Sequence, residues 1–267
     1  MRAHGVRLHH RESTAHPAGA PTVVLVHGLG MSATSVLPLL HELEPHVRVL
    51  APDLPGYGRS QRPPHAPGVG GTADVLREWT RALGVEGAAF VGCSLGAQVV
   101  VNLAARHPEL LGRAVLVGPT RDPSAPSPWR QAFRLLRDVP NERWSLVPLA
   151  VLSYLRAGPR RMWLLLRDAL SRSVEDGLPV VRVPTLVVRG EHDPVATQRW
   201  VEEVVRLTPG ARLRVLPGCG HAPNFSRPRQ LAEAVLPFLT GARAEAPEGS
   251  EGSQWSQWSR ETVGVAR

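Results

Sequence analysis

The sequence predicts an α/β fold in which a mostly parallel sheet is covered by helices on both faces. The first observation is a repeated alternation of short apolar runs with stretches of helical periodicity. The second is that these runs are continuously apolar, which is typical of strands buried on both faces. The third is size, since 267 residues with 43% hydrophobic side chains suffice for one large domain. The predicted strands are residues 22–26, 47–50, 88–91, 114–117, 185–188 and 213–216.

Helices are predicted directly after the first three of these strands. Residues 35–43, 72–83 and 97–106 repeat apolar side chains at the spacing of one helix face. Each follows a strand through a loop rich in glycine or proline, as a parallel sheet requires. The first half of the chain therefore consists of repeated strand–helix units.

The alternation of strands and helices stops between residues 121 and 182. Proline-led stretches rich in leucine, arginine and tryptophan predict helices there without intervening strands. We therefore assign residues 1–120 and 183–240 to an α/β core and residues 121–182 to an inserted helical cap. The segment 241–267 is rich in glutamate, glycine and serine and has no core-forming pattern, so we expect a disordered tail.

Composition excludes several classes of protein. The net charge is +8, but every basic residue is arginine and no run of basic residues resembles a nucleic-acid patch, so we expect no nucleic-acid partner. No apolar stretch is long enough for a membrane span, and residues 1–7 lack the apolar segment of a signal peptide, which predicts a cytoplasmic enzyme. Cys93 and Cys219 form neither a disulfide framework nor a zinc motif, and we interpret both as buried thiols. No cofactor and no metal site are predicted.

The segment GCSLG at residues 92–96 predicts a nucleophile at Ser94. It lies between a predicted strand and a predicted helix, where a sharp turn exposes the serine hydroxyl at the carboxyl end of the sheet. Side chains at Gly92 and Gly96 would clash with the neighbouring helix and strand. The amino terminus of the following helix places partial positive charge beneath the hydroxyl oxygen.

A serine nucleophile needs a base, and a base of this kind needs an orienting acid. His221 follows the last predicted strand, in a loop that reaches the same sheet edge as Ser94. Asp193 follows the preceding strand, and the order Ser94, Asp193, His221 is the order of nucleophile-elbow hydrolases. Asp122 and Glu191 are the alternative acids, of which Asp122 is the stronger. The other histidines considered are expected to be solvated or at the surface: His9, His10, His16, His41, His46, His65 and His107.

An oxyanion site is predicted in the loop VHGLG, residues 26–30, which follows the first long strand. We assign the backbone N–H groups of Leu29 and Leu95 as the oxyanion donors. His27 is expected to hold this loop by hydrogen bonds rather than to act as a second base.

Five segments together resemble the α/β-hydrolase superfamily in its lidded form, over about residues 20–240. They are VHGLG, APDLPGYGRS, GCSLG, GEHDPV and GCGHAP. The resemblance implies a structural role for Asp53, Gly56, Gly58 and Ser60 in the floor of the site. Cys93 departs from the polar or aromatic residue that more often precedes the nucleophile, but the turn still directs Ser94 towards substrate.

These observations predict a serine hydrolase that cleaves a small carboxylic ester through an acyl-enzyme. Thioester hydrolysis, C–C bond hydrolysis and acyl transfer on the same triad remain alternatives, and a non-catalytic ligand-binding module is the alternative of another class. Residues 121–172 contain ten arginines and four acids. We interpret these arginines as a solvated face, with the cap tryptophans in the core. The alternative is a basic entrance for an anionic or carrier-bound substrate.

Overall fold

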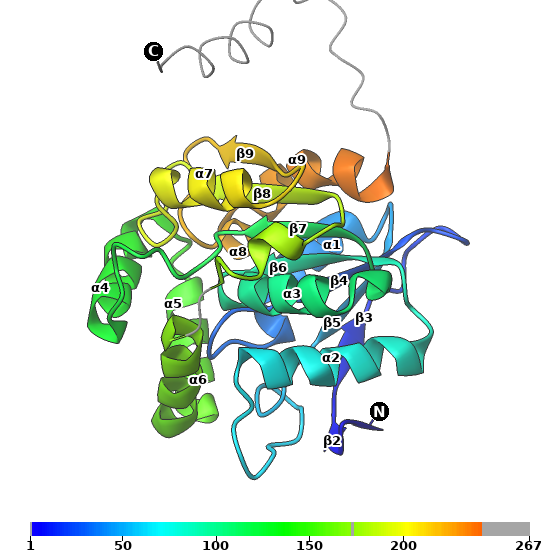
Figure 1. Cartoon of the computed structure of the whole chain (residues 1–267), viewed down its shortest axis with the longest axis horizontal. Coiled ribbons are helices and arrows are strands. Elements are labelled where there is room, and N and C mark those ends of the chain that lie inside the picture. The colour runs from blue at the N-terminus through cyan, green and yellow to red at the C-terminus, as the bar shows by residue number, and fades with distance from the viewer. Residues whose placement is uncertain (1, 172–173, 242–267) are drawn as a thin grey trace, which may run out of the picture.

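A seven-stranded sheet forms the centre of the computed structural model, which describes residues 2–171 and 174–241 (Figure 1). The strand order is β3-β5-β4-β6-β7-β8-β9. All neighbouring pairs are parallel except β3 and β5, so the predicted α/β fold is confirmed. The strands are β3 (His10–Glu12), β4 (Thr22–Val26), β5 (Arg48–Pro52), β6 (Ala88–Cys93), β7 (Leu111–Val117), β8 (Thr185–Gly190) and β9 (Arg212–Leu216).

Helices cover both faces of this sheet because consecutive strand residues point to opposite faces and both faces are apolar. On β4, Val24 packs in one buried cluster with α2, α3 and α7, whereas Val23 packs in the other cluster with α1 and α9. Both valines are fully buried. The core helices are α1 (Leu37–Leu43), α2 (Val69–Leu83), α3 (Leu95–Arg106), α7 (Gln198–Leu207), α8 (Pro223–Ser226) and α9 (Pro228–Thr240).

The amino-terminal segment forms structure that the sequence did not predict. β1 (Arg2–Ala3) and β2 (Val6–Arg7) make a two-stranded sheet, and β3 adds an antiparallel edge strand beside β5. The expectation that His9 and His10 are solvated is wrong: His9 Nδ1 lies 2.9 Å from Asp53 Oδ2, and the His10 ring packs edge-on against Trp79. The polar N-terminal sequence did not predict these contacts, because the partner of each histidine, Asp53 or Trp79, lies more than 40 residues further along the chain.

Among the described residues between β7 and β8 lie three α-helices: α4 (Pro128–Asp138), α5 (Leu146–Ala157) and α6 (Pro159–Ser171). Within the described residues no strand lies between them, and Figure 1 shows them grouped beyond one edge of the core. The division into a core of residues 1–120 and 183–240 and a cap of residues 121–182 stays a prediction. We call α4–α6 the cap helices.

The expectation that the cap tryptophans lie in the core is wrong. The exposed fractions of Trp129, Trp144 and Trp163 are 77%, 83% and 46%. In α4 the reason is that the helix turns its polar face inward: Gln131 and Asp138 are buried, Gln131 donates a hydrogen bond to the Ala125 carbonyl oxygen, and Asp138 accepts one from the His221 N–H of the core. Helical periodicity identifies an apolar face, but it does not say which face meets the core.

The predicted tail falls almost wholly outside the described residues, since residues 242–267 are not described. Gly241, with φ of 72°, ends α9 in the left-handed conformation that glycine adopts most readily. In the part of the chain that the structure describes, no helix combines the length and the apolar character of a membrane span.

Candidate active site

Ser94 lies in a strained turn between β6 and α3. Its backbone has φ of 56° and ψ of −120°, a conformation that side-chain-bearing residues rarely adopt. The turn allows no side chain at its flanking glycines: a Cβ on Gly92 would lie 2.5 Å from the Gly96 carbonyl oxygen, and a Cβ on Gly96 would lie 2.3 Å from that of Val26. The predicted clash with the neighbouring helix and strand is therefore present.

His221 connects Ser94 to Asp193 through two hydrogen-bond distances. His221 Nε2 lies 3.0 Å from Ser94 Oγ, and His221 Nδ1 lies 2.9 Å from Asp193 Oδ2. The Asp193 side chain is fully buried, and its other oxygen accepts hydrogen bonds from the backbone N–H groups of Val195 and Ala196 at 2.7 and 2.9 Å. These two bonds hold the carboxylate in place, so that one of its oxygens faces the imidazole.

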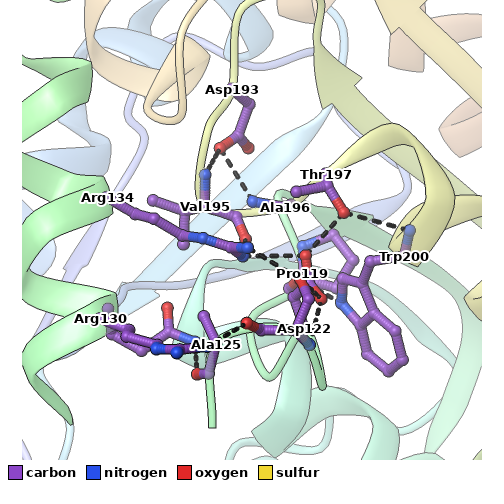
Figure 2. Close-up of polar contacts among 12 residues, drawn as sticks. Pro119, Asp122, Ala125, Arg130, Arg134, Asp193, Val195, Ala196, Thr197 and Trp200 are labelled. Atoms are coloured by element: carbon purple, nitrogen blue, oxygen red, sulfur yellow. Dashed lines mark hydrogen bonds and ion pairs between the residues drawn. The ribbon is translucent and has the colours of Figure 1, made fainter. Parts of the chain in front are cut away.

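Asp122, the alternative acid, forms its hydrogen bonds with residues other than His221 (Figure 2). One of its oxygens accepts hydrogen bonds from Arg134 at 2.8 Å and Thr197 at 2.6 Å. The other accepts from the backbone N–H and the hydroxyl of Ser124. These bonds lower the pKa of Asp122 against the opposing effect of its burial. Asp122 therefore connects the cap helix α4 to the segment that follows Asp193. The histidine of the site, His221, is hydrogen-bonded to Asp193 instead.

Glu191, the other alternative, points away from the imidazole. Its carboxylate accepts a hydrogen bond from the Gly218 backbone N–H at 2.8 Å, and its side chain is 53% exposed. Glu191 thus braces the loop after β9 from outside.

The loop after β4 lies directly beside the serine. A Cβ added to Gly28 would be 3.2 Å from Ser94 Cβ, so this loop approaches closely only because residue 28 is glycine. Leu95 is the first residue of α3, and its N–H consequently has no acceptor within the helix. Leu29 follows Gly28 in the adjacent loop. Both predicted donors therefore lie on segments that flank Ser94.

His27 holds this loop from below. It is fully buried, its Nδ1 lies 2.9 Å from the Gly28 carbonyl oxygen, and its Nε2 accepts a hydrogen bond from the Leu54 backbone N–H at 3.0 Å. Burial lowers the pKa of His27, which favours the neutral ring that this pattern requires. Asp53 also has a structural position, because its carboxylate accepts hydrogen bonds from the backbone of Ala33 and Arg59.

Two acids that sequence analysis did not single out as functional hold the loop of His221. Asp138, at the end of α4, accepts a hydrogen bond from the His221 backbone N–H at 2.9 Å. Glu142 accepts one from the Ala222 backbone N–H at 2.7 Å and also contacts the Ser226 hydroxyl. Burial and the neighbouring Asp138 raise the pKa of Glu142 to about 7. No local motif marks these acids, because their partners lie about 80 residues away.

The electrostatic surroundings favour the protonated form of His221. Burial alone would lower the pKa of this imidazole, but attraction to Asp193, Asp138 and Glu142 outweighs it and the pKa is raised. An imidazolium that forms when Ser94 loses its proton is stabilised by the same charges. The arrangement can therefore accept a proton at Nε2 and hold it.

Neither cysteine competes with Ser94. Cys93 and Cys219 are free and buried, and burial raises the pKa of Cys93 to about 12. A thiol with so high a pKa carries almost no thiolate at neutral pH, and the thiolate is the nucleophilic form.

Comparison with known proteins agrees with the fold. The family described as "Alpha/beta hydrolase family" matches residues 23–234, which is most of the chain. The chain belongs to this family. It is an enzyme of the hydrolase class, and its sequence relatives include proteins named as esterases.

Two of these relatives illustrate the range of the family. A pimeloyl-[acyl-carrier protein] methyl ester esterase of Vibrio vulnificus is 25% identical over 244 residues, covering 82% of this chain and 94% of the relative. The carboxylesterase YbfK of Bacillus subtilis is 27% identical over 250 residues, covering 84% of this chain and 82% of the relative.

Solved structures share the architecture of this α/β-hydrolase. An esterase from Thermogutta terrifontis has a TM-score of 0.74 at 22% identity, covering 87% of this chain and 92% of that chain. A meta-cleavage product hydrolase from Pseudomonas fluorescens has a TM-score of 0.71 at 26% identity, with coverages of 90% and 97%. The first likeness concerns the fold alone.

Proposed function

We propose that this α/β-hydrolase cleaves a carboxylic ester of a small molecule through a covalent acyl-enzyme. Ser94 is the nucleophile, His221 the general base, and Asp193 the acid that orients the base. The observation that carries the proposal is the continuous relay from Asp193 Oδ2 through both ring nitrogens of His221 to Ser94 Oγ, at 2.9 and 3.0 Å. At one end of this chain of hydrogen bonds, the buried carboxylate of Asp193 is held by two backbone N–H groups. At the other end is Ser94, whose backbone is strained.

The reaction follows from this geometry. Ser94 Oγ attacks the ester carbonyl while its proton passes to His221 Nε2, and the carbonyl oxygen becomes an oxyanion near the N–H groups of Leu29 and Leu95. Collapse of this intermediate breaks the C–O bond, and the imidazolium returns its proton to the leaving alkoxide. Water then attacks the acyl-enzyme with His221 again as base, which releases the carboxylic acid and restores Ser94. Asp193 stays ionised throughout and stabilises the imidazolium.

Ester hydrolysis is preferred to the other reactions of a serine triad because relatives that span most of this chain are named as esterases. One of them acts, by its name, on a methyl ester carried on an acyl-carrier protein. A carrier-bound ester is accordingly a substrate to test, alongside free esters.

The nucleophile can be tested with Ser94→Ala, which removes only the hydroxyl. We expect kcat on p-nitrophenyl butyrate to fall about 10⁶-fold with an unchanged circular dichroism spectrum, because loss of a triad nucleophile typically costs this much. A fluorophosphonate probe should label the wild-type enzyme and leave Ser94→Ala unlabelled.

Cys93→Ala is the matched control, since it removes the neighbouring nucleophilic atom from the same turn. It should retain both labelling and turnover. Labelling of Ser94→Ala, or near-wild-type turnover by it, would contradict the assignment, and a wild-type protein that neither reacts nor turns over would support a non-catalytic binding module instead.

A further inference from the structure

A cavity of about 260 Å³ lies at the junction of the loop after β4, the loop after β5 and the cap helix α5. From the loop after β4 it is lined by Gly30 and Met31, which directly follow the predicted oxyanion donor Leu29. From α5 it is lined by Ser153 and Arg156. The volume is slightly below the roughly 300 Å³ at which pockets for drug-sized ligands begin, so a small group fits it.

Positive charge dominates the wall of this cavity. Arg11, Arg59, Arg62 and Arg156 all line it, and none of the four forms an ion pair with a carboxylate of any described residue. The Arg62 guanidinium, on the loop after β5, donates to the backbone carbonyl of Arg156 on α5. This contact brings the two arginines together at the cavity. Guanidinium groups without a carboxylate partner offer paired N–H donors for a carboxylate or a phosphate.

Asp53, the single acid among the described residues that line the cavity, does not neutralise these arginines. Asp53 is 3% exposed, and both of its oxygens are already occupied. One accepts the Ala33 N–H at 2.7 Å, and the other accepts the Arg59 N–H at 2.9 Å and lies 2.9 Å from His9 Nδ1. Asp53 therefore shapes the wall and leaves the arginine side chains to a ligand.

We propose that this cavity is an anion subsite, which binds a carboxylate or phosphate group at the far end of an ester whose carbonyl lies at Ser94. The inference rests on the proposed function, and it names the class of substrate: a monoester that keeps a negative charge on its other end. The loop after β4 supports it, because Gly28 lies against Ser94 and Gly30, two residues further along the same loop, lines the cavity. A charged end held by arginines would fix the ester relative to the serine.

Two substrates of equal chain length test the proposal. p-Nitrophenyl hydrogen glutarate carries a free carboxylate, and p-nitrophenyl valerate does not. We expect Arg62→Gln/Arg156→Gln to lower the ratio of kcat/KM for the anionic over the neutral ester by about 10- to 100-fold, the range typical of hydrogen bonds to charged groups. The neutral ester should change less than about 2-fold by the same reasoning, because it makes no such bond.

The control is Arg137→Gln/Arg160→Gln, which removes the same charge from exposed positions of α4 and α6 outside the cavity wall. It should leave the ratio unchanged. An equal fall in this control would show a general effect of surface charge and overturn the subsite, as would an unchanged ratio in the cavity variant. Thermal melting of both double variants checks that their folds are equally intact.

A binding measurement separates this inference from the proposed function. Calorimetric titration of glutarate and of inorganic phosphate into Ser94→Ala needs no turnover, and the tighter of the two identifies the preferred anion. Binding should be lost when Arg62→Gln/Arg156→Gln is added. If neither glutarate nor phosphate binds, or if binding survives the two substitutions, the subsite is wrong even if the esterase activity is real. If the wild-type enzyme turns over neither ester, the proposed function is wrong instead.

Discussion

Ser94 combines a conformation that costs energy with a position that only close packing can provide. A residue with φ of 56° and ψ of −120° typically costs ~1–3 kcal/mol, and it persists because the strand before it and the helix after it fix its neighbours. Gly92 and Gly96 permit this close packing, because an added Cβ would lie only 2.5 Å from the Gly96 carbonyl oxygen and 2.3 Å from the Val26 carbonyl oxygen, respectively. The turn thus holds the hydroxyl 3.0 Å from His221 Nε2 before any substrate binds.

The acid of the proposed triad is tested by Asp193→Asn. The amide keeps the size of the side chain but presents the wrong hydrogen-bonding group to Nδ1, and it favours the wrong tautomer of His221. We expect kcat on p-nitrophenyl butyrate to fall by roughly 10⁴.

Asp122→Asn is the matched control, because Asp122 is also a buried acid after a neighbouring strand. Its bonds go to Arg134, Thr197 and Ser124, so its substitution should lower stability more than kcat. If the two kcat effects came out in the opposite order, the roles of the two aspartates would have to be exchanged.

At the scale of elements, α4 is an inverted amphipathic helix that touches both loops of the candidate triad. Arg134 lies 3.4 Å from the Val195 carbonyl oxygen in the loop of Asp193, and one turn later Asp138 accepts the His221 N–H. Its apolar residues Trp129, Phe133 and Leu136 face outward, with exposed fractions of 77%, 60% and 69%. Polar contacts with the core therefore set the orientation of this helix.

Asp138→Asn isolates the charge that α4 brings to His221, the proposed base. The amide oxygen can still accept the His221 N–H, but the negative charge that helps to raise the pKa of His221 is gone. His221 must be neutral to accept the proton of Ser94, so a lower pKa keeps it active at lower pH. We expect the acidic limb of the pH profile of kcat/KM to shift towards lower pH.

The control for this charge is Asp168→Asn, a second acid of the cap helices that accepts a backbone hydrogen bond, from Val69 at 2.7 Å. It anchors α6 to α2 rather than to the His221 loop. It should change stability without moving the pH profile, and an equal shift in both variants would rule out a local effect of Asp138 on the base.

Glu142, which accepts a hydrogen bond from the Ala222 N–H next to His221, makes the stability of the fold depend on pH. Its pKa is raised from 4.5 to about 7 in the folded chain, so the folded state binds more protons than the unfolded state between these values. The contribution of Glu142 to the free energy of unfolding is therefore complete at low pH and is lost as pH rises through about 7. In Glu142→Gln this loss should disappear, which urea unfolding of both proteins at pH 5 and pH 8 would measure. A wild-type protein that loses no stability relative to the variant between these two pH values would contradict this pKa.

For the whole molecule, the net charge of +8 carried by arginine predicts attraction of anionic substrates over distance. Such steering acts on encounter and is screened over ~8–10 Å at physiological salt. For p-nitrophenyl hydrogen glutarate, kcat/KM should fall as salt rises while kcat at saturation stays constant. The neutral valerate ester should show little salt dependence, and parallel curves for the two esters would remove electrostatic steering as an explanation.

Features that depend on residues close together in the sequence could be predicted, whereas features that depend on contacts between distant residues could not. All six predicted strands are present, and helices follow the first three of them, because continuous apolar runs and helical periodicity are local patterns that burial on both sheet faces enforces. Ser94, Asp193 and His221 could be nominated because each lies on the turn or loop that follows a strand of one parallel sheet, and the carboxyl ends of such strands meet at one edge.

Local patterns do not show which face of α4 meets the core, or which of the two aspartates that follow strands, Asp122 or Asp193, bonds to His221. Asp122 and Asp193 both follow strands, and only the packed structure shows that His221 bonds to Asp193 while Arg134 engages Asp122. The sequence by itself determined the six parallel strands of the sheet, the strained turn and the order of the candidate triad. Tertiary structure decided the inward polar face of α4, the acids Asp138 and Glu142 behind His221, and the arginine-lined cavity, because each depends on charges and hydrogen bonds between residues far apart along the chain.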